Sequence, residues 1–562
     1  MGYGITGYWI NGGHMAETLS ELYRNSFEQN AALPAFSDYG KEPITYAEAA
    51  EKVGKMHESF SEAGVKKGDE IALAARNSTN WVLTYLSAIT YGAVIVPILA
   101  DFKPTEVQHI INHSDSVLLF ASEEILEELE LEDAPKLAAA YRVDTMERVY
   151  LNKKAALFMK AVSAVKNIFQ RKKPEKESAQ FFSRDIPDSE TAAIVYTSGT
   201  TGLSKGVVLS RRSLYINVRF AMENMPLKAG DTVLSFLPLA HSFGCAFEFL
   251  FPTAVGCHIT YLDKLPSPTV LVEAFAKIKP RLILSVPLVL EKIYKNQIKK
   301  SIDGTATGFL MKVPVVGKGI EGVIRKKIIN VFGGNFMEIV IGGASLNPEV
   351  DDFFKSIKFP FTIGYGMTEC GPLVSYAGWK EHRKNSVGKL INYLEAKVDS
   401  DDPSKIPGEI LLKGENVMDG YYKNPAATKA VFQDGWLKTG DLGTIDSDGF
   451  IYLNGRSKNM ILGPSGQNIY PEEIEAKLLG MKYVSECVVV DRDGRITALV
   501  FPDLDAADKD GLDDAGLQQA MEDLRKKLNG ELPAYSQVSA VKIHAQEFEK
   551  TPSKKIKRFL YS

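Results

Sequence analysis

The chain has 562 residues, enough for roughly three or four domains of about 150 residues each. It is 45% hydrophobic and 24% charged, the ordinary composition of a soluble globular protein. Its 66 basic and 70 acidic residues give a formal net charge of −4, which gives no indication of nucleic-acid binding. The four cysteines lie far apart without a CxxC pair, so they favour a reducing cytosolic compartment over a disulfide framework or a structural zinc site.

The N-terminal residues lack the basic start and the long apolar stretch of a secretory signal. Residues 13–15 resemble a cloning remnant, so we place the start of the fold at Met15. The longest uncharged run, Trp81 to Ala100, has the length of a membrane span, but polar residues, Gly92 and Pro97 interrupt it. It predicts a buried helix, a stop at Gly92 and a short strand over Ala93–Ile98. We therefore expect a soluble intracellular protein.

Helical and strand patterns alternate along most of the chain. The first set comprises helices over Tyr46–Ala63, Asn80–Tyr91 and Pro104–His113 and strands over Asp69–Ala74, Val94–Ile98 and Val117–Phe120. The second set comprises helices over Ser213–Asn224 and Val270–Ile278 and strands over Thr232–Phe236, Leu282–Ser285 and Glu338–Ile341. Helices between short buried strands predict parallel sheets covered on both faces. We expect two doubly wound α/β units side by side.

After Ser386 the pattern changes to short strands and Gly/Asp turns. Strands are predicted over Gly408–Leu412, Gly443–Asp446 and Phe450–Leu453, which indicates a small β-rich module. A final α+β segment runs from about Ser457 to the end, with helices over Pro471–Leu479 and Leu517–Leu528 and strands over Val484–Asp491 and Arg495–Phe501.

Two charged stretches stand out. Ser122–Asp133 is acidic, whereas Leu151–Lys173 is basic and carries one apolar face at helical spacing. The basic stretch has two interpretations, which we weigh equally. It is either a surface helix packed on the domain or a helix that lies on an anionic membrane.

The strongest chemical signal is the loop that follows the apolar strand Thr191–Tyr196. Its members are the hydroxyl residues Thr197, Ser198, Thr200, Thr201 and Ser204, the glycines Gly199, Gly202 and Gly206, and Lys205. Glycine backbone N–H groups, hydroxyls and one cation together favour phosphate oxygens over a merely solvated turn. The loop lacks the Gly-Lys-Ser/Thr of a Walker sequence, and an apolar strand, Val207–Leu209, follows it instead of a helix. It therefore predicts a phosphate site unlike that of kinases or GTPases.

Further motifs follow in a fixed order. They are Leu237–Gly244 (LPLAHSFG), Gly342–Ser345 (GGAS), Gly364–Glu369 (GYGMTE), Gly435–Asp441 (GWLKTGD), Gly455–Lys458 (GRSK), Gly463–Glu475 and Thr551–Arg558 (TPSKKIKR). With the loop, this ordered set resembles the adenylate-forming enzymes: acyl-CoA synthetases, peptide-synthetase adenylation domains and luciferases. The resemblance runs from Leu19 to the C-terminus. Pro287–Lys295 and the basic Ile324–Ile329 look most like the long-chain fatty acid–CoA ligases.

The resemblance implies a fold. A large N-terminal ATP- and acyl-binding domain over residues 15–457 would hold two doubly wound α/β subdomains and a small distorted β-barrel. A small mobile α+β domain over residues 458–562 would follow, with Lys458 as the hinge.

The resemblance also implies roles for single residues. The nucleotide would be bound by Thr197, Ser198, Gly199, Thr200, Thr201, Gly202, Gly343, Ala344, Tyr365, Gly366, Asp441 and Arg456. Tyr365 would stack on adenine, and Asp441, expected in a turn, would take the ribose hydroxyls. Catalysis is assigned to Lys555, Thr368, Glu369 and Lys205, with Glu369 holding Mg²⁺. His241 and Gly342 would line the acyl pocket. Two positions depart from the family pattern: Asn459, where many relatives carry an acid, and Lys554, where glycine is usual.

The function expected from this resemblance is ATP-dependent activation of a long-chain fatty acid, followed by transfer to CoA. ATP and CoA would be co-substrates and Mg²⁺ the metal, in a cytoplasmic protein that touches the inner face of an anionic membrane if residues 151–173 bind it. Three alternatives stay open: an enzyme that loads an acyl carrier protein, a CoA ligase for another carboxylic acid, and a non-catalytic nucleotide-binding relative. A homodimer is one option for the assembly.

Overall fold

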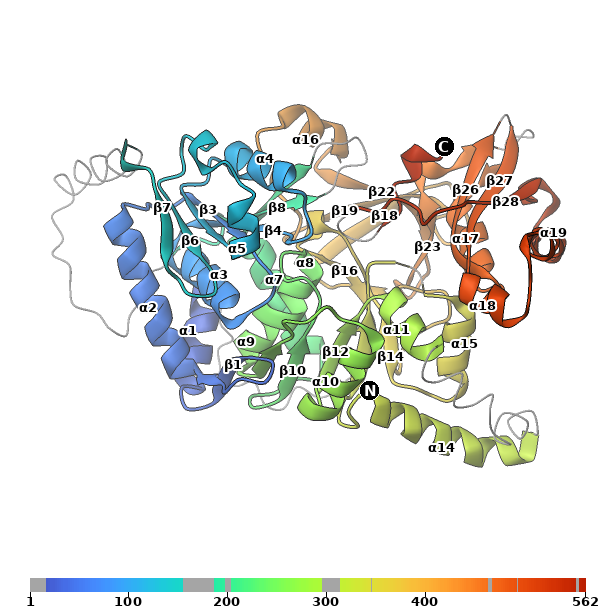
Figure 1. The fold of residues 1–562 in the computed structure, drawn as a ribbon, viewed down its shortest axis with the longest axis horizontal. Coiled ribbons are helices and arrows are strands. Elements are labelled where there is room, and N and C mark those ends of the chain that lie inside the picture. Colours follow the sequence, from blue (N-terminus) through green and yellow to red (C-terminus); the bar gives the residue numbers. More distant parts are fainter. Residues whose placement is uncertain are drawn as a thin grey trace.

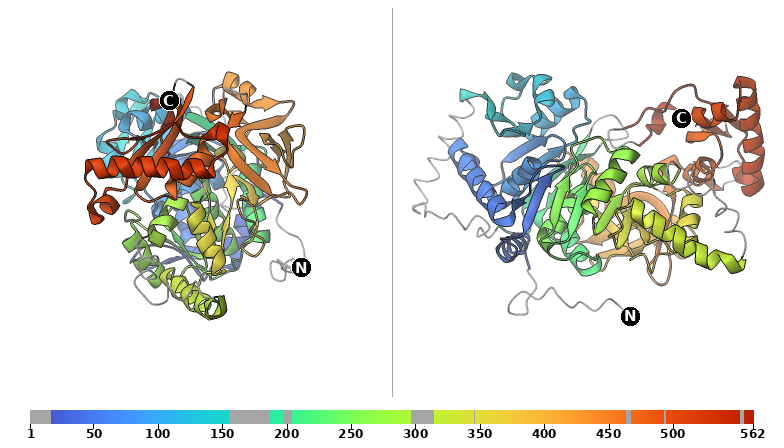
Figure 2. Two further views of the ribbon diagram at one scale, coloured as in Figure 1. Left: turned by 90° about the vertical axis from the view of Figure 1, so that its right-hand side faces the viewer. Right: turned by 60° about the horizontal axis from the view of Figure 1, so that its bottom comes forward.

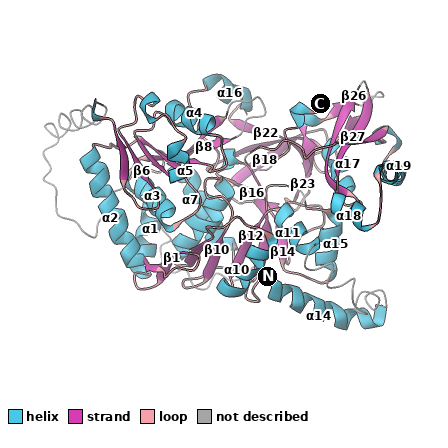
Figure 3. Cartoon of the chain, viewed as in Figure 1, coloured by secondary structure: helices cyan, strands magenta, loops and turns pink. Residues whose placement is uncertain are grey.

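The computed structural model describes residues 17–154, 186–197, 204–295, 314–344, 346–462, 467–492, 494–551 and 555–562. Two large sheets with helices against them and a β-rich module make up the larger part of the molecule, and a smaller α+β unit stands at one end (Figure 1). Colouring by secondary structure shows helices on the outside of the sheets (Figure 3).

The first sheet has eight strands in the order β20-β9-β8-β4-β3-β5-β6-β7. Its parallel centre consists of β8 (Thr191–Thr197), β4 (Val94–Ile98), β3 (Glu70–Ala74), β5 (Leu118–Ala121) and β6 (Ala139–Arg142). The antiparallel edges are β9 (Lys205–Ser210), β20 (Gly420–Tyr421) and β7 (Arg148–Leu151). The prediction of a parallel sheet is therefore correct for its centre but not for its edges.

Helices cover both faces of this sheet, because alternate residues of each strand point to opposite sides. Ile71 and Leu73 pack into the core that contains α2 (Tyr46–Ala63) and α3 (Thr79–Tyr91), whereas Ala72 and Ala74 face α4 (Pro104–Ser114). Every residue of α3 from Trp81 onward is buried, and the helix ends at Gly92 with φ +92°. The uncharged run is thus a core helix followed by a core strand, as predicted. No described helix is both long and apolar enough to cross a membrane.

The second sheet has seven strands in the order β14-β13-β12-β10-β11-β1-β2. They are β14 (Phe361–Ile363), β13 (Glu338–Ile341), β12 (Leu282–Ser285), β10 (Thr232–Ser235), β11 (His258–Tyr261), β1 (Pro34–Asp38) and β2 (Ile44–Thr45), and only β2 is antiparallel to its neighbour. The helices of this part include α7 (Arg211–Asn224), α8 (Ser242–Gly244), α9 (Phe251–Val255), α10 (Pro268–Ile278), α11 (Pro287–Ile293), α14 (Pro314–Val331) and α15 (Pro348–Ser356). Strand β1 was not predicted. It joins the N-terminal segment to the second sheet and so ties the two α/β units together.

The β-rich module contains β18 (Leu394–Asp399), β19 (Gly408–Gly414), β21 (Phe432–Gln433), β22 (Trp436–Ile445) and β23 (Ile451–Arg456). A second small sheet holds β15 (Tyr365–Gly366), β16 (Leu373–Tyr376) and β17 (Lys389–Leu390). The expectation that Asp441 lies in a turn is wrong, because β22 begins at Trp436 and continues through it. Leu437, Thr439 and Asp441 are buried in alternation, and the register with β19 shifts here around Gly440 at φ +71°. The Thr-Gly-Asp segment is therefore a bulge within a strand.

The C-terminal unit has a hydrophobic core of its own. Strands β26 (Val484–Arg492), β27 (Arg495–Pro502) and β28 (Ala540–Ile543) form its sheet, with α17 (Pro471–Leu479), α18 (Leu504–Lys509) and α19 (Asp514–Glu531) around it. In the tilted view of Figure 2 this unit extends from one end of the molecule. The architecture predicted from the sequence, two α/β subdomains, a β module and a final α+β unit, is confirmed.

Candidate functional site

The predicted site residues lie where several strands end and the C-terminal unit meets the larger part. In open α/β folds, ligands bind outside the carboxyl ends of the strands. Strand β8 ends at Thr197, which pairs with Lys205 at the start of the antiparallel strand β9. The glycine- and hydroxyl-rich segment thus joins the two strands of a hairpin, and the prediction that a strand follows it is confirmed. Residues 198–203, which include five predicted phosphate ligands, lie outside the described residues.

Asp441 connects three elements of the site. Its Oδ1 lies 2.8 Å from Arg456 Nε on β23, and its Oδ2 accepts a 2.5 Å hydrogen bond from the hydroxyl of Tyr365 on β15. Burial raises the pKa of the Asp441 carboxyl, while Arg456 and Tyr365 oppose that rise. Each carboxylate oxygen keeps a second lone pair, so the group can still accept hydrogen bonds from sugar hydroxyls.

Glu369 lies on the short 3₁₀ helix η4 (Thr368–Cys370). Two buried asparagines fix this turn: Asn217 and Asn416 both donate to the carbonyl of Cys370, at 3.1 and 2.9 Å, and both also bind the backbone of Leu373. The carboxylate of Glu369 accepts a 2.9 Å hydrogen bond on Oε1 from Tyr421. The turn therefore presents the Thr368 hydroxyl and the Glu369 carboxylate from a rigid base.

Four cations converge on the same region from three parts of the chain. Burial lowers the pKa of Lys458, and the positive charges of Arg456, Lys205 and Lys555 lower it further. Lys555 is solvent-accessible but surrounded by protein atoms, and burial together with Arg456 lowers its pKa, whereas Asp441 and Glu369 raise it. Like charges are held together in this way where a polyanion is bound. The C-terminal unit thus contributes a lysine to a site formed by the larger part.

A magnesium ion would fit this arrangement. Among the described residues there is no group of three or more His, Cys, Asp or Glu side chains that could hold a metal ion. Mg²⁺ in nucleotide sites needs no such cage, because one or two carboxylates and the substrate phosphates suffice. Glu369 supplies a partly exposed carboxylate beside the cation cluster, and Thr368 precedes it with a hydroxyl.

His241 lies close to this cluster from another side. Burial lowers its pKa to about 4, and Lys555 contributes to the shift, so the imidazole is neutral at pH 7. Its Nδ1 accepts a 3.3 Å hydrogen bond from the backbone N–H of Phe243, which leaves the proton on Nε2. The phenyl ring of Phe243 packs against Gly342, where a Cβ atom would lie 3.0 Å from the ring. His241 and Gly342, both predicted to line the acyl pocket, are thus linked through Phe243.

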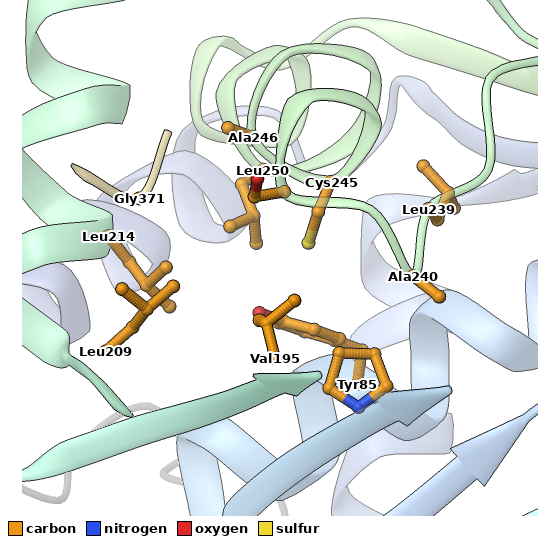
Figure 4. A pocket seen from close by; sticks show the side chains of 12 residues that line it. Tyr85, Val195, Leu209, Leu214, Leu239, Ala240, Cys245, Ala246, Leu250 and Gly371 are labelled. Atoms are coloured by element: carbon orange, nitrogen blue, oxygen red, sulfur yellow. The ribbon is translucent and has the colours of Figure 1, made fainter. Parts of the chain in front are cut away.

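Next to residues 239–246 is a small cavity (Figure 4). Its volume is about 10 Å³, and its walls include Tyr85, Val195, Leu214, Cys245 and Leu250 from both α/β units. Ser242 Oγ also lines it and is buried without a hydrogen-bond partner among the residues that the structure describes. This space holds one water molecule at most and is far too small for an acyl chain.

The AMP-binding enzyme family matches residues 23–422, well over half of the chain. The chain belongs to the AMP-binding enzyme family. The prediction of the adenylate-forming superfamily is therefore confirmed.

The sequence identity to individual relatives is low. A long-chain-fatty-acid–CoA ligase of Mycobacterium bovis is 28% identical over 489 residues, which cover 82% of this chain and 78% of the relative. A chloroplastic long-chain-fatty-acid–[acyl-carrier-protein] ligase of Arabidopsis thaliana is 27% identical and covers 88% of this chain and 77% of its own length. The fold is similar to that of the o-succinylbenzoate coenzyme A synthetase of Bacillus subtilis in complex with ATP and magnesium ion, with a TM-score of 0.73, 21% identity and coverage of 96% and 98%.

In this region the structure brings together most of the described residues that the motifs predicted as site residues. They are Lys205, His241, Gly342, Tyr365, Thr368, Glu369, Asp441, Arg456, Lys458 and Lys555. Gly343 and Ala344 are exposed just after β13, and the backbone of Gly366 approaches Pro372 so closely that a Cβ would lie 2.4 Å from its carbonyl oxygen. Sequence reasoning missed Tyr421, Asn217 and Asn416, which contact Glu369 or fix its turn. The only sequence signal for Tyr421 was that Gly420 precedes it and a second tyrosine, Tyr422, follows it.

Proposed function

We propose that this family member is an AMP-forming long-chain fatty acid–CoA ligase. The observation that supports adenylate formation most directly is Lys555, which the C-terminal unit inserts among Arg456, Asp441, Glu369 and His241. The choice of a long-chain fatty acid rests on relatives named for that substrate and on the segments Pro287–Lys295 and Ile324–Ile329.

The first half-reaction follows from the charge distribution. A carboxylate oxygen of the fatty acid attacks the α-phosphorus of ATP, the bond to the bridging oxygen breaks, and pyrophosphate leaves. Negative charge builds up around phosphorus in this step, so cations fixed beforehand lower the barrier. Lys205 and Lys555 would supply that charge, and Glu369 with Thr368 would hold Mg²⁺, which neutralises the phosphates when bound. Asp441 would fix the ribose and Tyr365 the adenine.

The fatty carboxylate must also be oriented. Neutral His241 carries its proton on Nε2 and would donate it to the carboxylate in a hydrogen bond without adding charge. The Phe243 ring and Gly342 would form the start of the acyl pocket.

In the second half-reaction the CoA thiol loses its proton to solvent, its sulfur attacks the acyl carbon, and AMP leaves with the oxygen that joined it to the acyl group. AMP is a good leaving group, so little general-base assistance is needed. Lys555 occupies part of the site during adenylation, and we propose that the residues 458–562 rotate about Lys458 to remove it. The larger part, residues 15–457, would keep the adenylate.

The test is pyrophosphate release measured with a series of saturated acids from two to eighteen carbons, with and without CoA. The proposal predicts a preference for the longest acids and formation of acyl-CoA when CoA is present. Preference for short or aryl acids would contradict the proposed substrate. The Arabidopsis relative supports one alternative acceptor, so the same assay is run with an acyl carrier protein, and thioester on the carrier but not on CoA would favour that function.

A further inference from the structure

Tyr421 touches both charged groups that would handle the phosphates. Its hydroxyl donates to Glu369 Oε1 at 2.9 Å, and its ring centroid lies 5.0 Å from the ammonium nitrogen of Lys205. No motif pointed to this residue. It lies on β20, which is remote in sequence from both partners.

The backbone of Tyr421 is held firmly. Strand β20 pairs with β9, with Tyr421 opposite Val207, and the backbone N–H of Tyr421 donates to Thr428 Oγ1 at 2.9 Å. Gly420 precedes it at φ +140°, where a Cβ would lie 2.7 Å from the Thr428 side chain, so only glycine permits this close approach. The Tyr421 side chain therefore extends from a fixed backbone position and can orient Glu369 and Lys205.

The hydrogen bond distinguishes the two oxygens of Glu369. Because Oε1 accepts from the phenol, Oε2 is the oxygen left without a hydrogen bond among the residues that the structure describes. Mg²⁺ takes few protein ligands and demands a strict octahedral geometry, so a carboxylate that is held in one rotamer binds it better than one that rotates.

The aromatic face has a separate role. An ammonium group within about 6 Å of a ring centroid is attracted by the ring quadrupole. Lys205 lies near other cations, and its positive charge contributes to the lowered pKa of Lys458. The ring of Tyr421 gives the Lys205 ammonium a favourable position that needs no anion.

We infer that Tyr421 is a positioning residue for the phosphate end of the nucleotide: its hydroxyl directs Glu369 Oε2 to the metal ion, and its ring holds Lys205 ready for the phosphates. This inference rests on the proposed function for the identity of the nucleotide site. It adds a residue that itself touches neither metal nor substrate.

The test separates the two roles with Tyr421→Phe, which removes only the hydroxyl, and Tyr421→Leu, which removes the ring as well. The matched control is Tyr422→Phe, because the neighbouring phenol donates to Glu70 Oε1 at the same distance, 2.9 Å, without contacting the site. Binding of Mn²⁺ is measured by electron paramagnetic resonance in the presence of a non-hydrolysable ATP analogue. Binding of the analogue without metal is measured by calorimetry.

Tyr421→Phe should weaken Mn²⁺ binding by about 10-fold or more, as expected when a ligand loses its orienting partner, and should leave metal-free analogue binding unchanged. Tyr421→Leu should weaken metal-free binding as well, by roughly 2- to 5-fold, because the cation–π contact is lost. Tyr422→Phe should behave as wild type in both measurements.

The coupling between the two residues is tested in a Glu369→Gln background. There Tyr421→Phe should have no further effect on Mn²⁺ binding, since the residue acts through Glu369. Wild-type Mn²⁺ affinity in Tyr421→Phe, or an equal loss in Tyr422→Phe, would overturn the inference while leaving the proposed function intact. Failure of the wild-type protein to bind the analogue at all would overturn both.

Discussion

Two polar contacts between the C-terminal unit and the larger part hold the unit in the orientation that delivers Lys555. They are the hydrogen bond from Asn454 Nδ2 to Glu473 Oε1 at 2.8 Å and the Lys295–Asp503 ion pair. If the unit rotates between half-reactions, these contacts must break. The double variant Asn454→Ala with Lys295→Ala removes both of them without changing a residue of the proposed nucleotide site.

The size of the effect follows from the exposure of the two contacts. The Lys295 side chain is 62% exposed, so its ion pair with Asp503 stabilises the orientation by about 1 kcal/mol at most. The exposed hydrogen bond of Asn454 contributes about 0.5–1.5 kcal/mol. Together they amount to roughly 1–2 kcal/mol, which is about a 5- to 30-fold change in the ratio of the two orientations.

The assay compares two single-turnover rates. Pyrophosphate release from ATP and palmitate reports the first orientation, and thioester formation from supplied palmitoyl-AMP and CoA reports the second. The ratio of the second rate to the first should rise by about 5- to 30-fold in the double variant. Lys384→Ala is the control, because its exposed ion pair with Asp352 lies within the larger part. An unchanged ratio in the double variant, or an equal rise in the control, would refute the account of these contacts.

Other predictions concern single groups. Lys555→Ala should slow pyrophosphate release by about 100-fold or more, because a preorganised charge is lost, yet still form thioester from supplied acyl-AMP; equal loss of both half-reactions would contradict this. Since the pKa of Lys555 is lowered, the charged lysine is present at low pH and lost as pH rises through a value below the ordinary 10.5, so kcat/KM for adenylation should fall on the alkaline side, and Lys555→Arg should remove that fall. Lys205→Ala should raise the KM for ATP by about 10- to 100-fold at unchanged melting temperature. Replacing Phe158 and Phe169, which lie outside the described residues, with serine should weaken salt-sensitive binding to anionic vesicles if the basic stretch binds membranes.

Much of the fold was predictable because local periodicity follows burial. Tyr46–Ala63 and Glu338–Ile341 begin and end at the residues that the pattern predicted, and Val94–Ile98 agrees to within one residue. In each of them the spacing of the apolar residues in the sequence matches the face that is buried in the structure. Gly92 was predictable as a helix stop for a local reason too, since it takes up a left-handed conformation.

What the sequence did not predict depends on pairing between distant segments. Pro34–Asp38 carries a proline, a serine and an aspartate, and it becomes a strand only because β11 and β2 flank it. Asp441 looked like a turn residue because Thr-Gly-Asp is turn chemistry, but β19 pairs with the segment and makes it a bulge.

In the site, too, local patterns were predictable and contacts between distant segments were not. The motif residues were predictable as a set only through their resemblance to a family, since nothing local in Lys555 or Arg456 indicates that they meet at Asp441. Tyr421 was missed because its role depends on the pairing of β20 with β9.

Isotope labelling of the fatty acid oxygens tests the proposed acyl-adenylate intermediate most directly. Palmitate labelled with ¹⁸O in both carboxylate positions is incubated with the protein, ATP, Mg²⁺ and CoA, and the products are analysed by mass spectrometry. If the carboxylate attacks the α-phosphorus, AMP gains one ¹⁸O atom, palmitoyl-CoA keeps the other, and pyrophosphate gains none. Label in inorganic phosphate, or palmitoyl-CoA formed together with unlabelled AMP, would contradict an acyl-adenylate intermediate and with it the proposed function.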